Sequence, residues 1–214
     1  MTKMENETMI WIPHKMDEQE RYSAIMRAVV PRPVLLISTI GADGIANAAP
    51  FSSCAPICHN PPMFCFSVGL RKGRLKDTAR NIHATRCFVL NSVNESMVDV
   101  AVLTAKEFPP EVDEIKEAKL TALPSKMIPA PRIAECEINI ECKLIHDMKI
   151  GETHSLFVGE VACFHVKKEI LAEDGKIDPH RFLALGRLSG DYYCRTSERI
   201  FRERTWGMGK AVED

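Results

Sequence analysis

The sequence lacks an excess of charge of either sign and lacks any long hydrophobic run. Its 28 Lys and Arg residues nearly balance its 29 Asp and Glu residues, so no global field attracts nucleic acid or an anionic membrane surface. The longest aliphatic stretches resemble PVLLI and fall far short of the roughly 20 apolar residues that a membrane helix needs. We therefore expect no nucleic-acid partner and no membrane, and any anion site must be local.

An export signal is also missing from the first residues. The segment MTKMENETMIWIPHK mixes acids and bases before any apolar run, which is unlike a secretory or transit peptide. We therefore expect a cytoplasmic protein. Without export, the eight cysteines of this 214-residue chain are expected to be reduced thiols, and most have apolar neighbours, as buried free cysteines do.

Several familiar catalytic and binding motifs are absent. No G-x-G-x-x-G follows a strand, GLRKGRLK and GMGKAVE fail the Walker spacing, and no G-x-S-x-G elbow occurs, so the usual dinucleotide, triphosphate and hydrolase sites are unsupported. The segment CAPICH, residues 54–59, offers two thiols and an imidazole, but no second Cys/His pair completes a four-ligand zinc site. We expect no metal there; a redox role for Cys54 stays a minor alternative, and the roles of Cys54 and Cys58 stay open.

Patterns typical of strands dominate what is present. VLLISTI and IANAAPF flank the turn residues GADG, which predicts a hairpin. The alternation in AECEINIECKL indicates a half-buried strand, and Gly159 inside a later strand indicates a bulge or a close backbone approach. The predicted strands are 34–40, 45–51, 61–69, 86–93, 132–148 and 153–171.

Few helices are expected beside these strands. Residues 21–30 have helical spacing and end at a proline pair, Leu75, Ala79 and Ile82 share one helical face, and 95–106 forms another helix. The acidic, proline-bearing stretch 107–132 is predicted to run over the surface with one short helical turn, and 173–181 forms a turn. The sequence thus predicts one mostly β domain over residues 1–214, a β-barrel with a few helices.

The segment RKGRLKDTARNI, residues 71–82, combines features of an anion site. Gly73 allows a turn, the following helix start presents unpaired N–H groups, and Arg71, Arg74 and Lys76 add positive charge. With the hydroxyl of Thr78, this combination suits a phosphate monoester. Taken alone, the segment is equally consistent with a solvated helix start that Asp77 caps.

The segment NAAPFSS, residues 47–53, follows the predicted hairpin turn. Its paired alanines leave a smooth backbone for a flat ring, the proline fixes a kink, and the phenylalanine adds an apolar wall. Its two serines add hydroxyl and N–H donors. The alternative interpretation is an ordinary strand end that leads into a loop.

In order and spacing, RPVLLISTIGADGIANAAPFSS, NPPMFCFSVG and GRLKDTARNI together resemble the flavin-reductase-like family of FMN-binding split β-barrel proteins, which includes flavoredoxin. The later segments PRIAECEINIECKL, GETHSLFVGEV and DPHRFLALGRLSGDYYCRT agree, so the resemblance spans about residues 25–198. It implies a homodimer of split barrels with FMN held non-covalently at the subunit interface. It also implies either NADH or NADPH as co-substrate, and a redox partner protein or monooxygenase component.

The resemblance assigns site residues by matching motifs. The first segment would line the flavin ring and ribityl chain, and the second would hold the phosphate, with Lys76 and Thr78 in direct contact. Asp77 would cap the helix or orient a neighbouring basic side chain. His154 matches a family position near flavin and nicotinamide and would be the catalytic residue, although Glu152 and Thr153 precede it where many members have glycine and aspartate. The implied cofactor-binding residues are Asn47, Ala48, Ala49, Pro50, Phe51, Ser52, Ser53, Arg71, Arg74, Lys76, Asp77 and Thr78.

The leading hypothesis from the sequence is an NAD(P)H-dependent flavin reductase-like oxidoreductase that passes hydride or electrons through bound FMN. Because the cofactor supplies that chemistry, no acid/base pair is required in the chain. The alternative is a flavoredoxin-type electron carrier that a partner protein reduces, with the acidic stretch KEFPPEVDEIKE as a docking surface. A sensory or storage flavoprotein without turnover is a third hypothesis.

Overall fold

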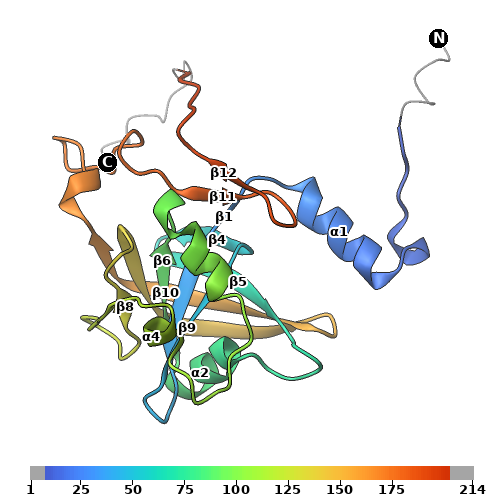
Figure 1. The fold of residues 1–214 in the computed structure, drawn as a ribbon, viewed down its shortest axis with the longest axis horizontal. Helices are drawn as coiled ribbons and strands as arrows, with labels where there is room; N and C mark the ends of the chain where they lie inside the picture. Colours follow the sequence, from blue (N-terminus) through green and yellow to red (C-terminus); the bar gives the residue numbers. More distant parts are fainter. Residues whose placement is uncertain (1–7, 203–214) are drawn as a thin grey trace, which may run out of the picture.

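The computed structural model describes residues 8–202, and a seven-stranded antiparallel sheet forms its body (Figure 1). The strand order is β3-β2-β6-β9-β10-β5-β4, so β3 and β4 form the two edges. Only two residues separate the end of β3 from the start of β4, so the sheet must curve until its edges approach each other. The sheet strands are β2 (Leu35–Ile40), β3 (Ala46–Phe51), β4 (Cys54–His59), β5 (Pro62–Gly69), β6 (Cys87–Ser92), β9 (Ile138–Ile150) and β10 (His154–Val166).

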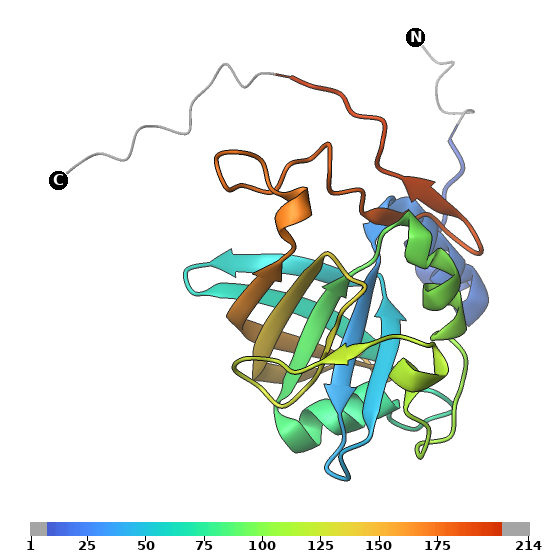
Figure 2. The same cartoon turned by 60° about the vertical axis from the view of Figure 1, so that its left-hand side comes forward.

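Short elements surround this sheet. In Figure 2, α2 closes the lower end of the curved sheet, and the segment that carries α3 and α4 covers the side formed by β2 and β3. The helices are α1 (Glu18–Ala28), α2 (Asp77–Thr85), α3 (Val98–Leu103) and α4 (Glu114–Glu117), with 3-10 turns η2 (Pro13–Lys15), η3 (Glu95–Met97) and η4 (Lys168–Ile170). The remaining short strands are β1 (Arg32–Pro33), β7 (Ala122–Leu123), β8 (Arg132–Ile133), β11 (Leu185–Arg187) and β12 (Tyr193–Arg195).

Aromatic rings fill the interior of the curved sheet. Phe66 lies at its centre, with its ring centroid 5.3 Å from Phe51, 5.0 Å from Phe88 and 5.6 Å from Phe157. Ala79 and Ile82 of α2 are buried in the same cluster. Leu75, in contrast, is 43% exposed, because α2 begins after it and its side chain does not lie on the helical face. The prediction that Leu75 shares a helical face with Ala79 and Ile82 is therefore wrong.

The predicted hairpin is confirmed, since β2 pairs with β3 and Ser38 lies opposite Ala48. Gly159 has both predicted features: the register of β10 against β9 shifts next to it, and a Cβ there would lie 2.5 Å from Phe88 Cζ. The strand predicted over 132–148 begins only at Ile138. Residues 134–137 turn instead, because β8 pairs with β7 in a separate ribbon and the chain must return to the main sheet.

The boundaries of other elements also differ from prediction. The first helix begins at Glu18, earlier than expected, because Asp17 and Glu20 form a capping box. The helix predicted over 95–106 is a 3-10 turn followed by α3, which ends at Leu103. The strand predicted over 153–171 ends at Val166.

The stretch 107–132 runs largely over the surface with one short helical turn, α4, as predicted, but part of it is buried, which its composition does not predict. Ile115 of α4 has no exposed surface, and Ala118 and Leu120 are buried beside it. These side chains pack with α3 and with β2 and β3 in the second large core cluster. Ile115, Ala118 and Leu120 are therefore part of the core, and α4 packs against β3.

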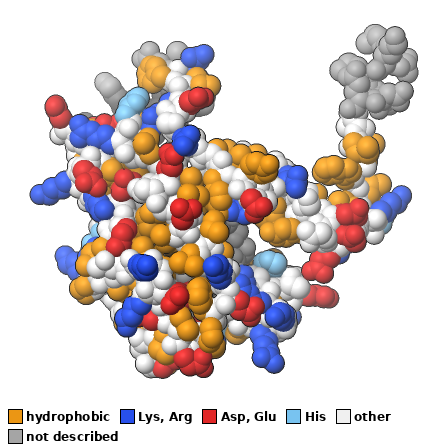
Figure 3. Space-filling model, viewed as in Figure 1, with side chains coloured by type: hydrophobic (Ala, Val, Ile, Leu, Met, Phe, Trp, Pro, Cys, Tyr) orange, Lys and Arg blue, Asp and Glu red, His pale blue; other side chains and the backbone are white. Residues whose placement is uncertain are grey.

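Helix α1 extends away from the barrel (Figure 1) and buries none of its residues. Tyr22, Ile25 and Val29 are 60%, 66% and 70% exposed and follow helical spacing, so they form one apolar stripe. Figure 3 shows hydrophobic side chains along this arm. None of the helices between residues 8 and 202 is both long and apolar enough to cross a membrane.

Candidate functional site

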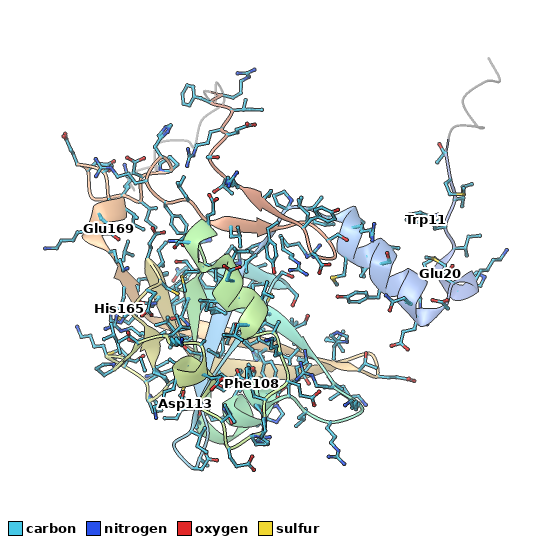
Figure 4. All side chains as sticks on the ribbon, in the orientation of Figure 1. Trp11, Glu20, Phe108, Asp113, His165 and Glu169 are labelled. Atoms are coloured by element: carbon cyan, nitrogen blue, oxygen red, sulfur yellow. The ribbon has the colours of Figure 1, made fainter. Side chains whose placement is uncertain are left out.

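A cavity of about 640 Å³ lies where β3, the loop before α2 and the segment before α4 meet. It collects residues from three distant parts of the sequence. Phe108, on the same side of the molecule as α2 in Figure 4, belongs to the third part. The lining residues are Asn47, Ala49, Pro50, Phe51, Arg71, Lys72, Arg74, Leu75, Lys76, Asp77, Thr78, Arg80, Thr104, Ala105, Lys106, Glu107, Phe108, Pro110 and Glu114.

The first turn of α2 presents backbone donors to this cavity. Lys76 is the N-cap, and its side chain accepts no bond from the helix, so the first N–H groups of α2 have no side-chain cap. Before it, Arg71 and Arg74 exchange two backbone hydrogen bonds of 2.9 Å across a tight turn. Lys72 and Gly73 adopt φ of 50° and 75° there, a region in which glycine is favoured. The turn and the helix start together form a site suited to an anion.

Positive charge predominates at this end of the cavity. Within residues 8–202, Arg71, Arg74 and Lys76 form no ion pair with a carboxylate. Burial, together with the nearby charge of Arg71, lowers the pKa of Lys76. A bound anion would relieve both effects, because it would offset the lost hydration and the repulsion between the two cations.

Asp77 forms an ion pair with Arg80, and Asp77 Oδ1 lies 2.5 Å from Arg80 Nη1. Its side chain therefore orients a neighbouring basic group, which is one of the two roles predicted for it. The N-cap position belongs to Lys76, so the other predicted role, capping the helix, is wrong. Pairing with Arg80 also offsets the negative charge that Asp77 brings to the cavity.

A buried polar network joins the two predicted segments. Thr78 donates its hydroxyl hydrogen to Asn47 Oδ1 at 3.1 Å, and Thr39 donates to the same oxygen at 3.4 Å. Asn81 Nδ2 donates to Thr39 Oγ1 at 3.1 Å. These bonds fix α2 against the hairpin. Since the hydroxyl hydrogen of Thr78 is used by Asn47, the group that Thr78 offers an anion is its backbone N–H.

The side chains of β3 are divided between the cavity and the core. Asn47, Ala49 and Phe51 line the cavity, whereas the side chain of Ala48 has no exposed surface and lies in the core cluster beneath α3 and α4. Because β3 is an edge strand, the N–H of Ala48 points away from β2. It donates to Glu114 Oε2 at 3.2 Å.

Glu114 is an almost fully buried carboxyl at the cavity wall, 6% exposed. Burial raises its pKa to about 7; the Ala48 N–H opposes this rise, Asp77 adds to it, and Arg71 opposes it. The cavity therefore contains a group whose charge changes near neutral pH. In the same acidic stretch, Glu107 pairs with Lys72 at 3.8 Å, and both side chains are exposed.

A second cavity of about 310 Å³ adjoins the first, since Pro50, Phe51 and Ala105 line both. Arg27, Arg32 and Arg187 line it with Tyr22 and Tyr193, and its lining contains no Asp or Glu. The three arginines form no ion pair in the part of the chain that the structure describes. The Arg187 guanidinium lies 4.5 Å from the ring centroid of Tyr193. This cavity therefore suits a second anionic ligand with an aromatic part.

The structure thus brings most of the predicted cofactor residues to one cavity and distributes the rest. Ser52 lines the second cavity, where its Oγ accepts from Arg32 Nε at 3.4 Å. Ser53 donates its hydroxyl to the Ser67 carbonyl at 3.0 Å. Ser53 and Ala48 line neither cavity, and neither does His154, which is exposed and lies opposite Gly69 on β5.

The cysteines of CAPICH do not converge. Cys54 is buried, whereas Cys58 and His59 are exposed. Burial, with a smaller contribution from Cys65, raises the pKa of the Cys54 thiol to about 12. Cys54 is therefore held as a thiol and has little nucleophilic or redox reactivity near neutral pH.

Sequence reasoning missed the wall formed by residues 104–110 and Glu114. Its prolines and charges are typical of a surface loop. The available signal was the apolar pair Ile115 and Ala118 within the charged run, whose i, i+3 spacing places them on one side of a short helix. Such a buried turn brings its neighbour Glu114 to β3.

Known proteins resemble this chain over most of its length. The model of the flavin reductase like domain matches residues 26–182. An uncharacterized protein of Aquifex aeolicus (strain VF5) is 38% identical over 188 residues, 87% of this chain and 95% of the relative.

Two solved structures are similar over nearly their whole length. Nitrilotriacetate monooxygenase component B from Bacillus cereus has a TM-score of 0.87 and 31% identity, over 92% of this chain and 100% of that one. The 2-nitrobenzoate 2-nitroreductase of Pseudomonas fluorescens has a TM-score of 0.85 and 29% identity, over 95% and 100%. The mostly β split barrel predicted from the sequence is confirmed, and the chain belongs to the flavin reductase-like domain family.

Proposed function

We propose that the protein is an FMN-binding oxidoreductase that accepts hydride from NADH or NADPH and passes electrons to a further acceptor. One observation carries this proposal: the apolar surface of Ala49, Pro50 and Phe51 on β3 and the uncapped, basic start of α2 line a single cavity of about 640 Å³. The strand surface suits a flavin ring, and the helix start suits a phosphate monoester.

The donors present fit FMN. Arg71, Arg74 and Lys76 would neutralise the dianionic phosphate, and the first N–H groups of α2 would complete its hydrogen bonding. Among the described residues, both side-chain hydrogen bonds to Asn47 end on Oδ1, which leaves its amide N–H groups free to donate into the cavity. Ala49 and Phe51 offer apolar surface to the ring. When bound, FMN would supply hydride acceptance and electron transfer.

We assign the second cavity to the nicotinamide nucleotide or another anionic aromatic substrate. Its three arginines without carboxylate partners suit phosphate or carboxylate groups, and Tyr22 and Tyr193 suit an aromatic ring. Because Pro50 and Phe51 line both cavities, a ligand here would adjoin a flavin in the first. Proximity of this kind is the main contribution that the protein makes to hydride transfer.

Anaerobic mixing of the FMN-loaded protein with NADH or NADPH tests this proposal. The expected result is bleaching of the flavin bands much faster than with free FMN. Arg187→Ala, which truncates an arginine of the second cavity only, should slow the bleaching and leave FMN affinity within about twofold. No acceleration by the wild type with either nucleotide would refute the reductase. Rapid reduction by a ferredoxin-type donor would then support the flavoredoxin-type carrier.

We further propose that two chains form a homodimer and that a monooxygenase component or another redox protein receives the electrons. The exposed stripe on α1 supports the dimer, because an isolated helix with no buried residues gains stability only by packing against something. The similarity to nitrilotriacetate monooxygenase component B supports a partner component.

A further inference from the structure

Three side chains of the kinds that bind metals meet on the face of the sheet beneath the 124–131 loop. Glu141 lies on β9, directly opposite Cys163 on β10, and His165 follows two residues later on the same face. One ligand atom from each lies within 4.8 Å of the others. In Figure 4, His165 lies on the side of the barrel away from α1, and none of the three lines either cavity.

We propose that Glu141, Cys163 and His165 form a binding site for Zn²⁺. The ligand atoms are Glu141 Oε1, Cys163 Sγ and His165 Nε2, and a water molecule takes the fourth position of the tetrahedron. A thiolate with an imidazole favours zinc over the hard cations Mg²⁺ and Ca²⁺, which prefer oxygen ligands. The site would link β9 to β10.

The carboxylate is already held as a metal ligand needs to be held. Glu141 has no exposed surface, and it accepts the backbone N–H of Lys126 at Oε1 and that of Met127 at Oε2, each at 2.7 Å. Such outer hydrogen bonds fix the orientation of a ligating carboxylate. They would stay in place when the metal replaces the hydrogen bond from His165.

The required rearrangement is small. His165 Nε2 and Glu141 Oε1 are 2.5 Å apart, and two ligands of a tetrahedral zinc ion lie about 3.4 Å apart, given metal–ligand distances of about 2.1 Å. The imidazole must therefore retreat by about 1 Å. It has room to do so, because its side chain is 24% exposed and β10 pairs with β5 only as far as Glu160.

The competing explanation is a simple ion pair between His165 and Glu141, with Cys163 as a bystander. Substituting Cys163 distinguishes the zinc site from the simple ion pair, since Cys163→Ser removes the sulfur ligand and leaves the hydrogen bond between His165 and Glu141. The folded state should therefore survive this substitution, and circular dichroism checks that it does. Cys58→Ser is the matched control, because Cys58 is an exposed thiol on β4.

The test is titration of the purified, reduced full-length protein with Co²⁺, followed by competition with Zn²⁺. We expect one Co²⁺ per chain, a thiolate-to-cobalt absorption band, and displacement by Zn²⁺. Cys163→Ser should lose the band and weaken Zn²⁺ binding at least about tenfold, whereas Cys58→Ser should match the wild type. Absence of stoichiometric binding, or equal binding by Cys163→Ser, would overturn the site. Loss of the band in Cys58→Ser alone would also overturn it, because the metal would then bind at β4.

Discussion

At the scale of single residues, Glu114 makes the stability of the protein depend on pH. Its pKa is raised from 4.5 to about 7, so between these values the folded state keeps a proton that the unfolded state has lost. The free energy of unfolding therefore falls as pH rises through this window, and the loss persists above it. Below about pH 4.5 both states are protonated, and the residue contributes no pH dependence.

Glu114→Gln should remove this loss. The difference in free energy of unfolding between the variant and the wild type should be about 2 kcal/mol more favourable to the variant at pH 8 than at pH 5, since glutamine stays neutral. Urea denaturation at the two pH values measures the gain. Glu117→Gln, on an exposed position of the same helix, should gain nothing. Equal pH dependence of wild type and Glu114→Gln would contradict the raised pKa.

Thr78 connects the helix start to β3 through its hydroxyl. Thr78→Val keeps the shape of the side chain but deprives Asn47 Oδ1 of its 3.1 Å hydrogen bond. We expect the free energy of unfolding to fall by about 1–2 kcal/mol, because a buried acceptor is left poorly satisfied. The urea midpoint provides the measurement. Thr153→Val, at an exposed turn, should change little, and a similar loss in both variants would argue against the network.

At the scale of elements, close packing of β10 against the barrel interior depends on Gly159. An added Cβ would lie 2.5 Å from Phe88 Cζ and 2.9 Å from Cys142 Cβ, so Gly159→Ala should destabilise the protein by about 1–3 kcal/mol. Thermal unfolding measures this loss. If the clash with Phe88 is the cause, the double variant Gly159→Ala with Phe88→Leu should lose less than the sum of the single losses. Strict additivity would exclude that cause.

Elements were predictable where local pattern and tertiary role agree. The strands of the hairpin and the start of α2 carry their signals within a few contiguous residues. Strand β4 was missed because Pro56 interrupts CAPICH; the structure accommodates it at an edge, next to a register shift. The burial of Glu114 could not be predicted, because its partner is the N–H of Ala48 on an edge strand 66 residues away.

At the scale of the whole molecule, the projecting helix α1 is the feature that a single chain leaves unexplained. If its apolar stripe packs against a second chain, light scattering should give twice the 24.0 kDa mass of one chain. Ile25→Glu places a charge within the stripe and should shift the mass toward one chain, whereas Gln19→Glu adds the same charge at a polar position of the helix. A monomeric wild type would contradict the proposed homodimer.

Above all, we propose that the cavity holds FMN with its phosphate at the start of α2. Comparing FMN with riboflavin, which lacks the phosphate, tests it directly by quenching of flavin fluorescence. The wild type should bind FMN far more tightly than riboflavin. Lys76→Ala should weaken FMN binding about ten- to hundredfold with little effect on riboflavin, and Asp77→Asn should act mainly through local order, on both ligands alike. Equal FMN affinity in wild type and Lys76→Ala would contradict the account.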